Sequence, residues 1–215
     1  GNPVRQSLLD NQITRETAAS AFGFNPNLKT VLVLGGSLGA RTINQTLAAG
    51  LALMKAHPEV QFIWQTGKIY IDQEKAAITA FTGEAVRNAR VGSIPNLYVT
   101  DFIKNMNNAY TLADLVISRA GAGSISEFCL LGKPVILVPS PNVAEDHQTK
   151  NALALVNKDA ALYVKDAEAQ EKLLDTALET VADDELLKQL SVNIAKLALP
   201  DSARIIAEEV LKLIK

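Results

Sequence analysis

Short apolar runs rich in β-branched residues alternate with longer segments of helical periodicity, and this alternation limits the possible fold more than any other feature. Such a pattern is typical of βαβ units around a parallel sheet. We expect buried strands at 30–34, 60–65, 97–100, 115–118, 134–138 and 161–164. We expect helices, long enough for right-handed crossovers, at 40–55, 70–82, 105–113, 124–131 and 144–157. The sequence therefore predicts a single α/β domain with a Rossmann-like, doubly wound parallel sheet.

Both ends of the chain are predicted to be helical and to lie outside this alternation. After residue 164 only helical periodicity remains, at 168–182, 185–197 and 202–215, so we expect a helical C-terminal tail. The last segment carries an apolar stripe with spacings of three and four residues, and such a stripe should be buried against something. A weaker helical pattern covers 14–22, with Thr14 in a position to cap it.

Composition and charge exclude several classes of protein. The 215 residues are 48% hydrophobic and 20% charged, which is typical of a folded globular domain. The net charge of −2 argues against a nucleic-acid-binding protein, because such proteins carry strongly basic surfaces. Cys129 is the single cysteine, so no internal disulfide can form and we expect a cytoplasmic protein. No apolar run reaches about 18 residues, so we expect no membrane-spanning helix.

A glycine-rich loop at 35–41 leads from the first predicted strand into a helix. Glycines such as Gly36 and Gly39 let a ligand approach the backbone, and the free N–H groups of a helix start attract phosphate. The loop and its Ser37 are therefore candidate phosphate contacts, with a plain strand-to-helix turn as the alternative. The full G-x-G-x-x-G pattern is missing and no acidic residue occurs at 65–67, so a nicotinamide-dependent dehydrogenase is disfavoured.

A second glycine-rich turn, at 118–127, opens another helix on the same edge of the sheet. Two neighbouring helix starts suit a diphosphate, because both direct N–H groups and a partial positive charge toward it. Glu127 is a candidate acceptor for the vicinal hydroxyls of a ribose. The alternative is a capping box, in which Ser124 and Glu127 each bond a backbone N–H at the helix start.

A polar loop at 139–148 follows the fifth predicted strand, at the edge where open α/β sheets bind ligands. His147 and Gln148 can both donate and accept hydrogen bonds, so they are candidates for binding sugar hydroxyls. A purely surface role is the alternative for both. Glu145 and Asp146 are explained equally well as favourable charges at a helix N-terminus.

The sequence predicts no metal site and no cofactor. The two histidines and the cysteine are not clustered at ligand spacing, and no D-x-D triplet is present to hold a metal-bound diphosphate. We therefore expect the charge of a diphosphate to be met by the two helix N-termini, with Ser37 and a cation such as Arg5 nearby.

Seven segments of the chain, in order and spacing, resemble the MurG family of N-acetylglucosaminyltransferases. They are 1–5 (GNPVR), 35–41 (GGSLGAR), 44–45 (NQ), 100–103 (TDFI), 118–122 with 126–127 (SRAGA, SE), 132–134 (GKP) and 146–152 (DHQTKNA). The resemblance covers essentially the whole chain. It implies one half of a two-domain GT-B glycosyltransferase. Such an enzyme transfers N-acetylglucosamine from UDP-N-acetylglucosamine to undecaprenyl-pyrophosphoryl-muramyl-pentapeptide, with inversion and without a catalytic metal.

The resemblance also implies roles for individual residues. Arg5 and the backbone around Ile103 would face the uracil. Ser37 would face the diphosphate and Gln148 the sugar, while Glu127 would bind the ribose hydroxyls. The helix start beside Glu127 would face the phosphates and the ribose, through Ala122, Gly123, Ser124, Ile125 and Ser126.

The family's first domain is expected to be absent from residues 1–215, which would then form the donor-binding domain alone. That first domain carries the lipid-binding loop, the membrane-facing patch and the proposed general base. We therefore expect residues 1–215 to contain no catalytic residue, to bind UDP-N-acetylglucosamine weakly and to transfer nothing. For the full-length protein the resemblance implies peripheral attachment to the cytoplasmic face of the plasma membrane.

Two other functions remain open from the sequence. One is a UDP-N-acetylglucosamine 2-epimerase-like domain, for which Glu127, Glu145 and Asp146 are the acidic candidates. The other is a non-catalytic module that binds a UDP-sugar. Incubation with UDP-N-acetylglucosamine alone separates the epimerase, which would form an epimer, from the other functions.

Overall fold

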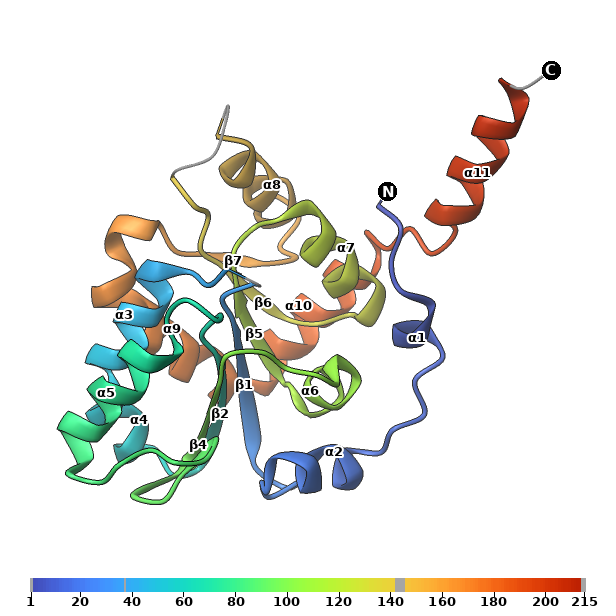
Figure 1. The fold of residues 1–215 in the computed structure, drawn as a ribbon. Coiled ribbons are helices and arrows are strands. Elements are labelled where there is room, and N and C mark those ends of the chain that lie inside the picture. Colours follow the sequence, from blue (N-terminus) through green and yellow to red (C-terminus); the bar gives the residue numbers. More distant parts are fainter. Residues whose placement is uncertain (1, 37, 142–145, 214–215) are drawn as a thin grey trace.

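The computed structural model describes residues 2–36, 38–141 and 146–213, which form one sheet with helices on both faces (Figure 1). The strand order is β3-β4-β2-β1-β5-β6-β7, and all neighbouring pairs are parallel except β3 and β4. The strands are β1 (Lys29–Leu34), β2 (Val60–Gln65), β3 (Arg90–Val91), β4 (Ile94–Thr100), β5 (Leu115–Ser118), β6 (Val135–Leu137) and β7 (Leu162–Tyr163). The predicted Rossmann-like α/β fold is confirmed. Strand β3 was not predicted, because two residues carry no readable periodicity.

Most helices lie close to their predicted positions, but the short helix α1 was not predicted. The helices are α1 (Gln6–Leu9), α2 (Arg15–Phe22), α3 (Arg41–Ala49), α4 (Leu51–Ala56), α5 (Ile71–Thr82), α6 (Met106–Leu112), α7 (Ala122–Leu131), α8 (His147–Val156), α9 (Ala169–Ala182), α10 (Asp184–Ala195) and α11 (Ser202–Lys212). A 3₁₀ turn, η2, covers Asp166–Glu168. Thr14 caps α2 as predicted, since its side chain accepts a hydrogen bond from the N–H of Thr17.

The single helix predicted at 40–55 is wrong, because α3 and α4 meet at Gly50. The N–H of Gly50 ends α3 by donating to the carbonyls of Thr46 and Leu47. A Cβ placed on Gly50 would lie 1.9 Å from Cδ1 of Leu174. Helix α9 therefore packs directly on the backbone where the two helices meet.

Each face of the sheet has its own apolar core. Side chains alternate along β1, so Val31 and Val33 enter one core while Leu32 and Leu34 enter the other. The first core is completed by α3, α4, α5 and α9, and the second by α2, α6, α7 and α8, on the opposite face (Figure 1). Because both faces are covered, the central strands are continuous apolar runs.

Helix α11 projects away from the body of the domain (Figure 1). Its apolar stripe was expected to be buried, but Ile206 is 45% exposed, Val210 is 50% exposed and Leu211 is 64% exposed. Within the described part of α11, Ser202 is the one buried residue. The stripe therefore has no packing partner among the residues that the structure describes.

The loops after β1 and β2 touch through two glycines. Gly39 and Gly67 both have positive φ, 86° and 84°, and a Cβ on Gly67 would lie 2.4 Å from the nitrogen of Gly39. Next to them, Asn44 of α3 donates to the carbonyl of Thr66 at 2.8 Å and accepts from the indole N–H of Trp64 at 2.9 Å. These contacts fix the start of α3 against the end of β2.

A half-buried polar cluster closes the opposite edge of the sheet. Arg15 of α2 binds the Asp114 carboxylate at 2.8 Å, and the same carboxylate accepts from the N–H of Thr30 at 2.8 Å. Lys133 donates to the carbonyl of Ala113 at 2.9 Å, and burial lowers the pKa of its ammonium to about 8. The cluster therefore joins α2 to the amino ends of β1, β5 and β6.

Replacing Gly67 with alanine should destabilise the domain more than the same change at Gly83. Both residues have positive φ, but a Cβ on Gly83 meets nothing within 4 Å, so Gly83→Ala should cost about 1 kcal/mol for backbone strain alone. Gly67→Ala adds the overlap with Gly39 and should cost more than about 2 kcal/mol. Urea unfolding of both variants measures the difference, and equal midpoints would contradict the close packing of the two loops.

The free energy of unfolding should depend on pH through Lys133. Its folded pKa of about 8 lies below the ordinary 10.5, so the unfolded chain binds more protons between these values. The parent protein should therefore gain stability relative to Lys133→Met as the pH rises from 8 to 10.5, by roughly 2–3 kcal/mol. Urea titrations across this range test the effect. Lys188→Met, at an exposed position of α10, is the matched control and should run parallel to the parent.

Candidate functional site

A cavity of about 260 Å³ opens at the carboxyl edge of the sheet, between the ends of β1 and β5. The chain continues from β1 to β2 on one side and reaches β5 on the other, so the strand order reverses at this point. Gly35 and Gly36 line the cavity from the first loop, and Ser118, Arg119 and Gly121 line it from the second. Open α/β sheets bind ligands in such a crevice.

Two helices begin at this edge of the sheet without side-chain caps. Helix α3 begins after Ala40 and α7 after Gly121, and at neither position does a side chain cap the helix. A Cβ placed on Gly36 or Gly121 would meet no atom within 4 Å, so the backbone at both positions borders open space. Both predicted helix N-termini are therefore uncapped. The start of α7 lines the cavity through Gly121 and Ser124, whereas the first turn of α3 does not line it.

Gly39 and Ser37 are the other predicted residues of the first loop, and the structure describes only Gly39. Gly39 does not line the cavity, because its missing side chain makes room for the loop after β2, where a Cβ would lie 2.5 Å from the carbonyl of Thr66. Its glycine is thus explained by packing between the loops. Ser37 lies outside the described residues, and its contact with a diphosphate stays a prediction.

Glu127 stands on the cavity wall with its carboxylate held from two sides. Its Oε2 accepts from the hydroxyl of Tyr110 at 2.7 Å, and its Oε1 accepts from Nη2 of Arg5 at 3.3 Å. The capping-box alternative is wrong: α7 begins at Ala122, so Ser124 and Glu127 both lie inside the helix. The carboxylate is therefore available to side chains and ligands at the cavity.

Tyr110 is a cavity residue that the sequence analysis missed. It lies on α6, is 3% exposed and packs edge-on against Phe128 of α7, with ring centroids 6.2 Å apart. Burial, together with the neighbouring Glu127, raises the pKa of the Tyr110 hydroxyl well above its ordinary value. The hydroxyl therefore remains a proton donor at physiological pH. No motif marks this tyrosine, since its partner is 17 positions away and on another helix.

Gln65 and Arg119 were also missed as structural residues of the cavity. The side-chain amide of Gln65 donates to the carbonyl of Gly36 at 2.8 Å and of Asp101 at 3.0 Å, which joins the loops after β1 and β4. Arg119 donates to the carbonyl of Val138 at 3.0 Å and forms an ion pair with Asp166. Its charge is therefore already compensated at the cavity.

The remaining predicted residues of α7 do not all face this cavity. Ser124 lines it, as do Arg5 and Ile103. Ala122 and Gly123 form the exposed first turn of α7. Ile125 and Ser126 instead line a separate hollow on another side of the helix. Their predicted contacts with a ligand remain untested.

The polar loop after β6 lies beyond the residues that line the cavity. Gln148 accepts from the N–H of Ser140 at 2.9 Å, so it joins the two ends of the loop. Asp146 precedes α8 and accepts from the hydroxyl of Thr149 at 2.6 Å, which is consistent with a role at the helix start. His147 is exposed as the first residue of α8, and Glu145 lies outside the described residues.

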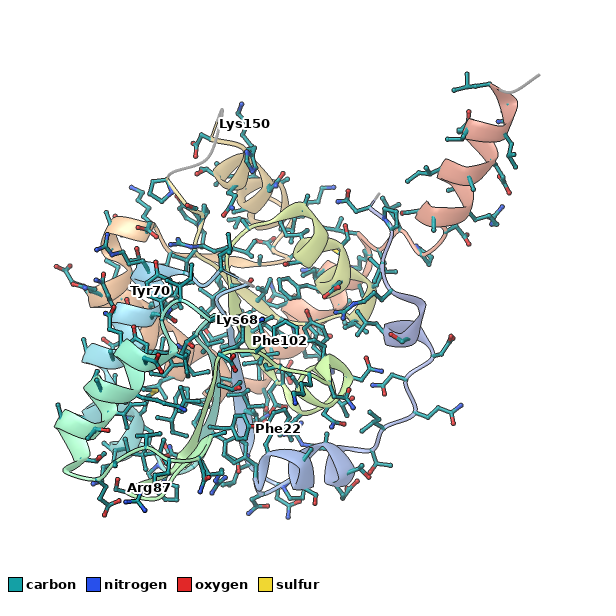
Figure 2. The ribbon with its side chains drawn as sticks, viewed as in Figure 1. Phe22, Lys68, Tyr70, Arg87, Phe102 and Lys150 are labelled. Carbon is teal, nitrogen blue, oxygen red and sulfur yellow. The ribbon has the colours of Figure 1, made fainter. Side chains whose placement is uncertain are left out.

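The outer edge of the cavity is apolar. Phe102, from the loop after β4, is 51% exposed and lines the cavity beside the buried Ile103. Phe102 and Lys68 lie near the centre of the view in Figure 2, and Arg87 lies at its lower edge.

The described residues contain no group of three or more histidine, cysteine or acidic side chains able to hold a metal. In the same residues, no helix combines the length and apolarity needed to cross a membrane.

Comparison with known sequences places this architecture in a family. Residues 30–205 match the glycosyltransferase family 28 C-terminal domain. The chain is 68% identical over 213 residues to the UDP-N-acetylglucosamine–N-acetylmuramyl-(pentapeptide) pyrophosphoryl-undecaprenol N-acetylglucosamine transferase of Bacteroides fragilis, covering 99% of this chain and 53% of that protein. It is 66% identical to the protein of the same name from Bacteroides thetaiotaomicron, covering 99% and 55%. The chain thus spans about half the length of these relatives.

Solved structures agree with the sequence relatives. The crystal structure of Acinetobacter baumannii MurG superposes with a TM-score of 0.72 at 25% identity, over 95% of this chain and 55% of that one. The UDP-GlcNAc 2-epimerase of Neisseria meningitidis gives a TM-score of 0.64 at 17% identity, over 96% and 51%, which shows a shared fold alone. With the family match over residues 30–205, the chain belongs to the glycosyltransferase family 28 C-terminal domain family.

Proposed function

We propose that the chain is the donor-binding half of a glycosyltransferase that converts lipid I to lipid II in peptidoglycan synthesis. The complete protein would transfer N-acetylglucosamine from UDP-N-acetylglucosamine to the lipid-linked muramyl-pentapeptide, as the names of its relatives state for those proteins. The observation that carries the proposal is the cavity at the strand-order reversal, with the uncapped start of α7 and Glu127 on its wall. This arrangement suits a nucleoside diphosphate.

Each part of the donor would meet a different part of the site. The N–H groups at the starts of α3 and α7, with Ser37, would bind the diphosphate through hydrogen bonds and the helix dipoles. Glu127 would accept from the ribose hydroxyls, while Arg5 and the backbone at Ile103 would face the uracil. Gln148 would bind the sugar. Because backbone groups supply the positive potential, we propose that no metal is needed for the diphosphate.

Transfer would depend on the other half of the protein. Among the residues that line the described cavity, Glu127 carries the carboxylate. This carboxylate already accepts hydrogen bonds from Tyr110 and Arg5, so it is poorly placed to remove a proton from the acceptor substrate. We propose that the general base and the lipid-binding surface lie in the other half, which would attach peripherally to the cytoplasmic face of the plasma membrane. Residues 1–215 would bind the donor and transfer nothing, since positioning and proton transfer both need the other domain.

Titration calorimetry of the 215-residue chain tests the donor site. UDP and UDP-N-acetylglucosamine should give saturable binding heat at up to millimolar concentrations, whereas NAD should give none. Absence of uridine-nucleotide heat at millimolar ligand would count against the site. A soluble lipid-linked acceptor added with the donor should remain unmodified, and glycosylation by this chain alone would contradict the division of labour.

Product analysis separates the epimerase alternative. The structural likeness to a 2-epimerase shows a common fold and carries no activity to this chain. Incubation with UDP-N-acetylglucosamine alone should leave the donor unchanged. Appearance of an epimer would replace the transferase proposal with the epimerase one.

Replacing Gly121 with valine should weaken UDP binding without unfolding the domain. Gly121 has φ −70° and ψ 137°, which valine tolerates, and its Cβ would enter open space. The added side chain would occupy the space between α7 and the diphosphate, so the affinity for UDP should fall at least about tenfold. Gly92→Val, at an exposed turn between β3 and β4, is the matched control and should bind UDP normally. Equal affinities of the two variants would place the diphosphate elsewhere.

A further inference from the structure

Tyr110 and Glu127 form a strongly constrained polar pair on the wall of the cavity. The tyrosine ring is buried between α6 and the core, edge-on to Phe128, so its hydroxyl has little freedom to move. That hydroxyl lies 2.7 Å from Oε2 of Glu127. The Glu127 side chain is 19% exposed, so the hydrogen bond is made largely out of water.

The second partner of Glu127 is a weaker constraint. Arg5 approaches Oε1 at 3.3 Å, and its own side chain is 59% exposed. An ion pair with so exposed a partner contributes little, because water screens the charges and the long side chain loses entropy when it is fixed. The orientation of the carboxylate therefore depends mainly on the tyrosine.

We infer that Tyr110 is a positioning residue that makes the cavity selective for ribonucleotides over 2′-deoxyribonucleotides. The inference rests on the proposed function, in which Glu127 binds the ribose of a nucleoside diphosphate. A carboxylate has about four lone-pair directions, and Tyr110 and Arg5 take one on each oxygen. One direction on each oxygen is left, which matches the two vicinal hydroxyls of a ribose.

Selectivity follows from the same geometry. Tyr110 fixes Oε2, so the carboxylate cannot rotate. It therefore cannot adjust to a sugar that offers one hydroxyl in place of two. A 2′-deoxyribose has no 2′-hydroxyl, so one acceptor direction of the partly buried carboxylate is left without a donor. This loss lowers the affinity of the site for the deoxyribonucleotide. Without the tyrosine hydroxyl the carboxylate can rotate toward Arg5 or water, and the distinction between the sugars weakens.

The test is a comparison of UDP with 2′-deoxy-UDP, measured by titration calorimetry on the 215-residue chain and its variants. The parent should bind UDP at least about tenfold more tightly than 2′-deoxy-UDP. Tyr110→Phe removes only the hydroxyl and should lower this preference by roughly threefold or more, chiefly through weaker UDP binding. Tyr163→Phe, on the edge strand β7, is the matched control and should keep the preference of the parent.

A second variant shows whether Tyr110 acts through Glu127. Glu127→Gln should lower the preference as well, and adding Tyr110→Phe to it should cause no further loss, because coupled residues are not additive. Thermal unfolding checks that each variant is folded. A destabilised but otherwise intact site would weaken both nucleotides equally, and that result would overturn the inference.

The outcomes also separate this inference from the proposed function. If the parent binds UDP with the expected preference and Tyr110→Phe leaves it unchanged, the donor site stands and the role of Tyr110 is wrong. If Tyr110→Phe and Glu127→Gln lower the preference for UDP by fully additive amounts, Tyr110 does not act through Glu127 and the inference is likewise overturned. If the parent binds neither nucleotide, the proposed function fails and the inference fails with it.

Discussion

Strand β1 is hydrogen-bonded to β2 on one side and to β5 on the other, and the rest of the molecule is arranged around this double pairing. The chain leaves the carboxyl end of β1 toward one half of the sheet and that of β5 toward the other. The two loops therefore separate and leave a crevice between them. Because both faces of the sheet are covered by helices, polar groups gather at its two edges without disturbing either core, and the crevice lies at the carboxyl edge.

In the proposed donor site, the positive potential would come mainly from the backbone. Arg119 is paired with Asp166 and with main-chain carbonyls, and Arg5 is paired with Glu127. Neither cation is left uncompensated for a diphosphate. The helix starts after Ala40 and Gly121 lack side-chain caps, so their backbone N–H groups are not satisfied by a capping side chain. A site of this kind would attract anions through backbone N–H groups at the helix starts. For anion binding, the geometry of the loops would then matter more than any one basic side chain.

The sequence predicted those features that depend on local pattern. The buried strands were readable because both faces are covered, and β2 and β5 occur at the predicted residues. The break at Gly50 was not readable, because it depends on the approach of Leu174 from a distant helix. The role of Glu127 was also undecided, since Gly121 and Ser124 are both acceptable cap residues and only the backbone shows that α7 begins after Gly121.

The elements of the candidate site differ in how firmly the domain holds them, and this bears on what the proposed donor half could do alone. Glu127 is anchored through Tyr110 to the core between α6 and α7, and Gln65 joins the loops after β1 and β4. These contacts are made entirely within this domain, so they do not depend on a second domain. Arg5, in contrast, is an exposed side chain near the N-terminus, and α11 carries an apolar stripe without a partner in the described chain. The nucleotide part of the proposed donor thus rests on a preformed core. The elements near the two ends of the described chain are held less firmly, so they are where a neighbouring domain would have the most influence.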